Sequence, residues 1–300
     1  MNNFDDIFEG AAPTGQPEQS SQPFDKDAWA DRKKAERQSV YELADTTAEA
    51  VSADGSKFRE YLEVQARFDR YSATNALLVL AQMPQATQIR DYDGWKDAGV
   101  SVKRHPKVIS ILEPGNEYQR EDGSVGTYYN VKRVYDISQT TARAKPQPTV
   151  SMDDRLLLKA LISRPPVPMQ MADELPNNMG AYYDHDQQVI FVRRGMEASD
   201  IFRSVSKELA HAELAAANGD YNRQDAAFVA YSVSYLLCRK YGIDASSYDF
   251  SHLPDNFRES DAQGIRAALT EIRDTAGEIS GRMYRVLEQS KPPKSKEQER

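Results

Sequence analysis

The segment Lys207-Glu208-Leu209-Ala210-His211 constrains this chain more than any other stretch. In the helical pattern His-Glu-x-x-His, two histidines four residues apart share one helix face and hold zinc, and the glutamate is general base for the metal-bound water. Glu208 and His211 keep the second and fifth positions, but Lys207 stands where the first histidine would be. A protonated ammonium has three donors and no acceptor, so Lys207 repels a metal cation. We therefore expect a helix of this type that lacks its usual metal ligands.

Composition sets the broad class of the chain. Its 300 residues suit roughly two domains, and 40% hydrophobic residues are enough for globular cores. No run reaches the about 18 apolar residues of a membrane helix, and the acidic N-terminus lacks the apolar core of a signal peptide. The single cysteine, Cys238, excludes an internal disulfide and is expected in the core. These features predict a cytoplasmic protein without a membrane partner.

Charge is unevenly distributed along the chain. The net charge of −8 disfavours a nucleic-acid partner, yet residues 57–145 hold 14 Lys and Arg against 11 Asp and Glu, while the remainder holds 24 against 35. A mildly basic segment inside an acidic chain indicates a local anion-binding face. Ordinary fluctuation of charge explains the same counts, and charge alone favours that explanation.

Hydrophobic periodicity and turn residues predict an α+β fold, with a small domain of helices and antiparallel strands followed by a helix-rich domain. The predicted helices cover 25–52, 57–83, 153–163, 196–217, 225–241 and 260–289. The predicted strands are 108–112 and 128–137, joined by a hairpin turn at Asp122 and Gly123, and a strand pair within 181–192. The predicted organisation is a disordered tail (1–24), a first domain (25–142), a linker (143–152), a second domain (153–289) and a second disordered tail (290–300).

Several separated motifs in the first domain resemble the N-terminal domain of ArdC-type antirestriction proteins. They follow the family's order over about residues 55–142, as Tyr71-Ser72-Ala73-Thr74-Asn75-Ala76-Leu77-Leu78, Ala81-Gln82, Ala86-Thr87, Trp95-Lys96, Gly99-Val100, the basic segment 103–107, the strand 108–113 and the closing segment 134–140. The resemblance implies binding of single-stranded DNA and carriage on conjugative plasmids and transposons. The whole chain is similar to the LtrC-like proteins of such elements in Gram-positive bacteria.

The chemistry of this segment is compatible with that implication, because single-strand binding needs cations for phosphates and flat faces for unstacked bases. Tyr71, Trp95, Tyr128 and Tyr129 offer such faces, although Trp95 is equally well explained as a core anchor. Lys132 and Arg133 point to opposite faces of a strand, and the cluster at 103–107 is also explained as a solvated loop. The predicted DNA-binding residues are Arg70, Tyr71, Asn75, Trp95, Lys96, Lys103, Arg104, Lys107, Lys132 and Arg133.

The second domain resembles the metallopeptidase-like domain of ArdC proteins, which is related to the ImmA/IrrE group of zincins. The match comprises 180–183, 189–192, 208–212 and the helix from 226 to 231. The resemblance implies a third zinc ligand early in that helix, where one register places Ala227 and a shift of two residues places Asp225. Glu208 and His211 are then either vestiges of a catalytic base and a metal ligand or members of a polar network in the core. Lys207 is expected to pair with Glu208 or Asp225 instead of a metal.

The sequence thus predicts a cytoplasmic single-stranded-DNA-binding accessory or antirestriction protein of a conjugative element. Its metallopeptidase-like domain would be inactive and without a cofactor, zinc being relevant only if the degenerate site still binds it. Besides DNA, a host restriction enzyme or nuclease, or a conjugation protein, is an expected partner. Two alternatives remain open: a zinc metallopeptidase acting on a regulatory or host protein, and a pseudo-protease that binds a protein without cutting it.

Overall fold

The computed structural model describes residues 25–120, 123–142, 153–217 and 219–290. The predictions for 1–24, Asp122, 143–152 and 291–300 lie outside these residues. The chain divides into two compact units, Met1–Glu36 and Arg37–Arg300. The described part of the first unit is the start of helix α1, where the side chain of Asp25 accepts hydrogen bonds from the backbone N–H of Asp27 and Ala28.

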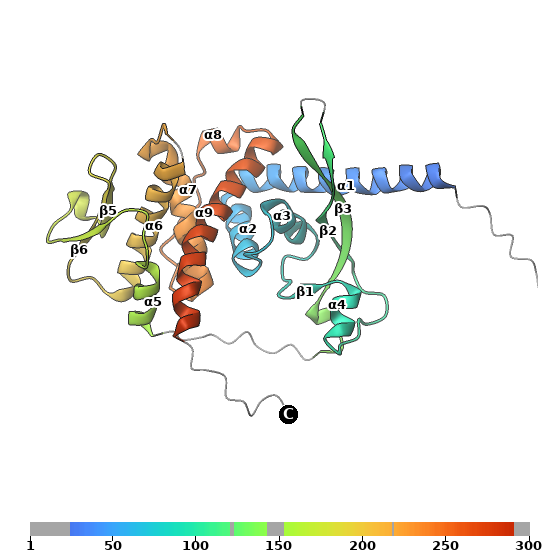
Figure 1. Cartoon of the computed structure of the whole chain (residues 1–300), viewed down its shortest axis with the longest axis horizontal. Helices are drawn as coiled ribbons and strands as arrows, with labels where there is room; N and C mark the ends of the chain where they lie inside the picture. Colours follow the sequence, from blue (N-terminus) through green and yellow to red (C-terminus); the bar gives the residue numbers. More distant parts are fainter. Residues whose placement is uncertain (1–24, 121–122, 143–152, 218, 291–300) are drawn as a thin grey trace, which may run out of the picture. The chain divides into compact units, whose positions relative to one another are not determined.

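The described residues form an α+β fold, as the sequence predicts (Figure 1). The helices are α1 (Lys26–Ala53), α2 (Gly55–Arg67), α3 (Ala73–Gln82), α4 (Tyr92–Asp97), α5 (Asp154–Leu161), α6 (Ala198–Ala217), α7 (Arg223–Tyr241), α8 (Asp255–Arg258) and α9 (Ala262–Gln289). The strands are β1 (Ile89–Arg90), β2 (Ile109–Gln119), β3 (Val125–Asp136), β4 (Met169–Ala172), β5 (Ala181–Asp184) and β6 (Val189–Arg193). Short 3-10 turns cover Ile137–Gln139 and Pro176–Asn178.

The single helix predicted over 57–83 is wrong, because the chain breaks between α2 and α3. Ser72 caps α3 by accepting a hydrogen bond from the backbone N–H of Asn75 at 3.2 Å. The buried amide of Gln65 donates to the carbonyls of Phe68 (3.1 Å) and Tyr71 (3.3 Å), which satisfies the turn. Apolar residues continue at helical spacing through the turn, and this hides the break from periodicity alone. The predicted stop is confirmed, since Met83 ends α3.

The first sheet has the order β1-β3-β2 with antiparallel pairing throughout. The predicted strands over 108–112 and 128–137 are confirmed as parts of β2 and β3, which continue as a paired hairpin out to Gln119 and Val125 (Figure 1). The register shifts between Pro114 and Glu117, which marks a β-bulge. The buried side chains of Leu78 on α3 and Leu112 on β2 pack with Val40 and Ala44 of α1.

The second sheet has the order β4-β6-β5, with β4 parallel and β5 antiparallel to β6. The predicted strand pair within 181–192 is confirmed, whereas β4 was not predicted because it is short and lies between prolines and polar residues. Helix α6 packs against β5 and α7, and α9 packs against α5 and α7.

Buried apolar residues from Ala48 to Leu287 form one cluster that includes members of both predicted domains. Phe58 of α2 packs on Phe228 of α7 and on Phe257 of α8, with ring centroids 5.0 and 5.5 Å apart. The division into domains at 143–152 stays a prediction. Cys238 is fully buried, as predicted, and burial raises the pKa of its thiol to about 11. No helix in the described residues is long and apolar enough to cross a bilayer.

Candidate functional site

Helix α6 carries the degenerate motif, and its three polar residues sit in different environments. Glu208 is fully buried and His211 is 2% exposed, whereas the Lys207 side chain is 35% exposed. Because β5 packs against α6, the backbone N–H of Tyr183 donates to Glu208 Oε2 at 2.9 Å. An isolated ionised carboxylate at such depth is unfavourable, so Glu208 needs further cationic partners.

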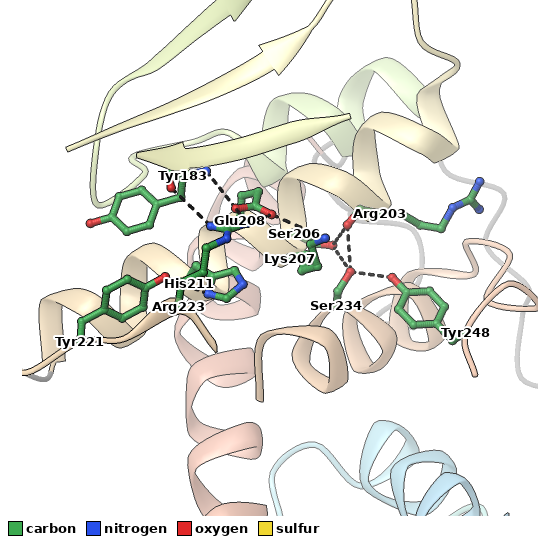
Figure 2. A network of polar contacts seen from close by, with 10 residues as sticks. All are labelled: Tyr183, Arg203, Ser206, Lys207, Glu208, His211, Tyr221, Arg223, Ser234 and Tyr248. Carbon is green, nitrogen blue, oxygen red and sulfur yellow. Dashed lines mark hydrogen bonds and ion pairs between the residues drawn. The ribbon is translucent and has the colours of Figure 1, made fainter. Parts of the chain in front are cut away.

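Arg223, in the first turn of α7, is the principal partner of Glu208 (Figure 2). Its Nη2 donates to both carboxylate oxygens, at 2.9 and 2.8 Å, and its Nη1 donates to the Tyr183 carbonyl at 3.3 Å. The guanidinium also lies 4.7 Å from the ring centroid of Tyr182. The predicted pairing of Lys207 is present but looser, with Nζ 3.6 Å from Glu208 Oε1. Both oxygens of Glu208 are therefore already engaged, which leaves this carboxylate poorly placed to activate a water.

Sequence reasoning missed Arg223, although one signal was available. Cations are disfavoured in the first turn of a helix because the N-terminal end of the helix dipole is positive. An arginine directly after the N-cap Asn222 therefore suggests that a buried acid elsewhere holds it.

His211 is held as a neutral imidazole. Its Nδ1 lies 3.0 Å from the hydroxyl of Tyr221. Burial first, and then the nearby charges of Arg223 and Lys207, lower the pKa of His211 to about 3. The two cations that lower this pKa would equally repel a metal ion at the same place.

The residues present do not fit a catalytic zinc site. Asp225 and Ala227, the two candidates for a third ligand, are both exposed and line one cavity of about 1000 Å³ together with Lys207 and His211. In the described ranges, no three His, Cys, Asp or Glu residues lie close enough to hold a metal ion. A catalytic zinc needs three protein ligands in a tetrahedral set. We therefore derive no hydrolytic step through a metal for this chain.

Hydroxyl groups behind the motif join α6 to α7 (Figure 2). Ser206 Oγ lies 2.7 Å from Ser234 Oγ, and Ser234 Oγ lies 2.6 Å from the Tyr248 hydroxyl. Ser234 also donates to the Arg203 carbonyl at 3.0 Å. Buried polar atoms that satisfy one another in this way stabilise the packing of α6 against α7.

A second hollow, of about 540 Å³, is lined by four cations and two tyrosine rings, and we call it the basic cavity. These six residues come from α2–α3, β1, β3 and α9: Arg70, Tyr71, Arg90, Tyr129, Lys132 and Arg273. Asp91 and Glu113 are the acidic residues that line it. The lining therefore carries two more positive than negative charges, although the whole chain is acidic.

Lys132 is the anchored cation of the basic cavity. Its Nζ lies 2.8 Å from Glu113 and 2.9 Å from Asp91, and hydrogen bonds to these two carboxylates raise the pKa of Lys132. Arg90 lies over the ring of Trp95, at 5.3 Å from the centroid. Arg273 of α9 donates to the Arg70 carbonyl at 3.5 Å, so the C-terminal helix contributes to this cavity.

The structure brings together only part of the predicted DNA-binding set. Arg70, Tyr71, Asn75 and Lys132 line the basic cavity, and Arg90 and Arg273 were missed. The side-chain amide of Asn75 donates to the Leu112 carbonyl and accepts from the Leu112 backbone N–H, each at 2.8 Å. The remaining predicted cations do not line the cavity and are exposed: Lys96, Lys103, Arg104, Lys107 and Arg133.

Trp95 takes the core position that the sequence left as an alternative. It is 2% exposed, and its indole N–H donates to the Tyr135 carbonyl at 2.8 Å. A DNA base cannot reach the buried Trp95 ring. The aromatic rings that line the basic cavity and are available for stacking are therefore those of Tyr71 and Tyr129.

Solved structures and a curated protein are similar to this chain. No family model matches this chain. Among solved structures, the chain is similar to the antirestriction protein ArdC from plasmid R388. The metal-free ArdC structure has a TM-score of 0.49 and 16% identity, covering 72% of this chain and 86% of ArdC. The Mn(II)-bound ArdC structure has a TM-score of 0.49 and 17% identity, covering 71% and 85%. ArdC is the family that the motifs of the first domain resemble.

A curated relative comes from Bacillus anthracis. This uncharacterized protein, pXO2-81, is 21% identical over 80% of this chain. The chain spans about half the length of that relative.

Proposed function

We propose that this protein binds single-stranded DNA as an accessory or antirestriction protein of a mobile conjugative element, within the cytoplasm. The observation that carries the proposal is the basic cavity, in which four cations and two tyrosine rings converge on one hollow of an acidic chain. Cations that follow the phosphates, combined with aromatic rings that stack on bases, are what binding of single strands requires.

The four cations have unequal roles in this proposal. Lys132 is tied to two carboxylates and holds the cavity's shape, whereas Arg70 and Arg90 are exposed and are the cations we assign to phosphates. Tyr71 is braced from behind by Phe68, with ring centroids 5.6 Å apart and planes within 9°. A braced ring loses little side-chain entropy when a base stacks on it. The exposed cations Lys96, Lys103, Arg104, Lys107 and Arg133 would extend the electrostatic attraction beyond the cavity.

The proposal assigns no peptide hydrolysis to the metallopeptidase-like region. Glu208 forms ion pairs with Arg223 and Lys207, and the positive charges of these two residues would repel a metal ion beside His211. A zinc metallopeptidase would need the opposite arrangement, with a free carboxylate beside a cation-binding site.

The direct test is equilibrium binding of a labelled single strand and of the same sequence as duplex, across a salt series. We expect preference for the single strand and affinity that falls steeply with salt, because bound phosphates release counterions. Equal affinity for both forms, or no binding at low salt, would overturn the proposal.

A second candidate function is favoured by the cavity beside the degenerate motif. Its lining combines the aromatic residues Phe228, Tyr231 and Phe257 with Lys207 and Asp225, which suits an extended peptide held without cleavage. Selection of binders from a peptide library by the purified protein, with no DNA present, would test this second function. For this function we expect bound peptides to be recovered intact and binding to be lost in the variant Asp225→Ala, which changes an exposed residue of the cavity. Cleaved peptides would contradict it.

A further inference from the structure

The β2–β3 hairpin carries an aromatic pair outside the basic cavity. The rings of Tyr118 and Tyr128 lie with centroids 4.2 Å apart and an interplanar angle of 35°. Tyr128 is nevertheless 51% exposed, so one face of the pair is open to solvent. Neither ring belongs to the hydrophobic clusters formed by the described residues. The pair is therefore not explained by core packing.

A glycine makes this arrangement possible. Tyr118 pairs with Gly126 across the hairpin, and a Cβ added to Gly126 would lie 2.5 Å from Tyr118 Cζ. The missing side chain lets the Tyr118 ring lie across β3 and reach Tyr128 two residues further on. Tyr118 thus supports Tyr128 from one side and limits its rotation.

Tyr128 directly precedes Tyr129 in β3 and shares a strand face with Lys132, and both Tyr129 and Lys132 line the basic cavity. Side chains at 128, 130 and 132 of β3 point the same way, because alternate residues of a strand share a face. Lys132 lines the basic cavity, and Tyr128 lies four residues along the same strand, about 13 Å away at the usual rise per residue. A single strand held in the cavity can therefore continue along the hairpin toward Tyr128.

We propose that Tyr128, supported by Tyr118, is a base-stacking surface that extends the DNA path from the basic cavity along the hairpin. The inference rests on the proposed function, since the occupant is the same single strand. Single-stranded DNA is the occupant because the face is flat and aromatic, and because it continues into a cavity with excess positive charge. The path also crosses Asn130, whose exposed amide lies between the two features.

The test compares oligothymidine strands of about 2 and about 16 nucleotides. At about 3.4 Å per nucleotide, the shorter strand falls short of the about 13 Å between Lys132 and Tyr128. The variants are Tyr128→Ala, Tyr128→Phe and the matched control Tyr284→Ala, which removes a tyrosine 54% exposed on α9. We expect Tyr128→Ala to weaken binding of the longer strand by roughly 5- to 150-fold, as stacking of one base contributes, and to leave the shorter strand unchanged. Tyr128→Phe retains the ring and is expected to bind like the natural protein.

The outcomes separate this inference from the proposed function. If the natural protein binds both strands and Tyr128→Ala binds the longer one equally well, the stacking surface is wrong and the proposed function stands. If the natural protein binds neither strand, both fall. A tryptophan introduced by Tyr128→Trp gives an independent readout, because a stacked base quenches indole fluorescence. Unchanged fluorescence on saturation with the longer strand, relative to the natural protein with Trp29 and Trp95, would also overturn the inference.

Discussion

The guanidinium of Arg223 donates hydrogen bonds to both oxygens of Glu208, at 2.9 and 2.8 Å, where a metallopeptidase would hold its catalytic base free. This pair joins α7 to α6. A cation supplied by the chain itself compensates the buried carboxylate, and Lys207 adds a second, looser one at 3.6 Å. The same pair leads to the first two predictions.

Replacement of Arg223 by alanine is expected to destabilise the protein by about 3 kcal/mol. It leaves the fully buried Glu208 with the looser Lys207 as its remaining cation, and breaking a buried ion pair costs about 3–5 kcal/mol. We expect a loss of stability at the lower end of this range because the Arg223 side chain is 30% exposed. Urea unfolding measures the change. The control is Arg194→Ala, whose partner Asp173 is 91% exposed, and which should cost less than about 1 kcal/mol. Equal effects of the two variants would contradict the role given to Arg223.

Metal chelation is expected to leave stability unchanged. If Arg223 and Lys207 compensate Glu208, neither EDTA nor added Zn²⁺ or Mn²⁺ should move the unfolding midpoint, because a ligand stabilises only a state that binds it. Thermal unfolding checks this, together with elemental analysis of the purified protein. One equivalent of tightly bound zinc, lost with a fall in the midpoint on EDTA treatment, would show that the site holds metal after all.

Asp136 should contribute to stability at neutral pH and lose that contribution in acid. It is 2% exposed; burial alone would raise its pKa, but hydrogen bonds from Ser138, Thr87 and Gln88 outweigh burial and hold the pKa below its usual value. A carboxylate with a depressed pKa stabilises the fold above its unfolded pKa of about 3.9, and this stabilisation disappears as pH falls through the folded pKa.

The matching measurement is the unfolding free energy of Asp136→Asn and of the natural protein. The variant should be less stable by about 2 kcal/mol at pH 7, as expected for hydrogen bonds to a charged group. The difference should shrink as pH falls below about 3.9. The exposed Asp186→Asn serves as control, and a difference at Asp136 that stays constant with pH would count against the assignment.

Much of the fold follows from the sequence because its elements have strong local signals. The β2–β3 hairpin, the pair β5–β6 and the long helices α6, α7 and α9 each have clear periodicity or turn residues. The break at Ser72 escaped prediction because Gln65, a residue of the preceding helix, satisfies it through side-chain bonds. Hydrophobic periodicity indicates which residues are buried, and buried residues continue through the turn between α2 and α3, so the pattern does not reveal the break.

The candidate sites were harder to predict because their residues meet only in three dimensions. Lys207 and Glu208 were visible as neighbours in one motif, whereas Arg223 arrives from the next helix. Arg273 reaches the basic cavity from more than 130 residues beyond Lys132. Its residue type alone made Trp95 a candidate for base stacking. The three-dimensional structure assigns it to the core, because the side chain is only 2% exposed and its indole N–H donates to the Tyr135 carbonyl.

The measurement that tests the central claim most directly is the salt dependence of single-strand binding by two matched double variants. One is Arg70→Ala with Arg90→Ala, in the basic cavity, and the other is Lys103→Ala with Lys107→Ala, exposed cations outside it. Each phosphate contact on a single strand contributes about 0.7 to the slope of log affinity against log salt. The cavity pair should therefore lower the slope by about 1.4 and weaken binding more than the outer pair. An unchanged slope for the cavity pair, with a reduced slope for the outer pair, would contradict the account and place DNA on the loop at 103–107.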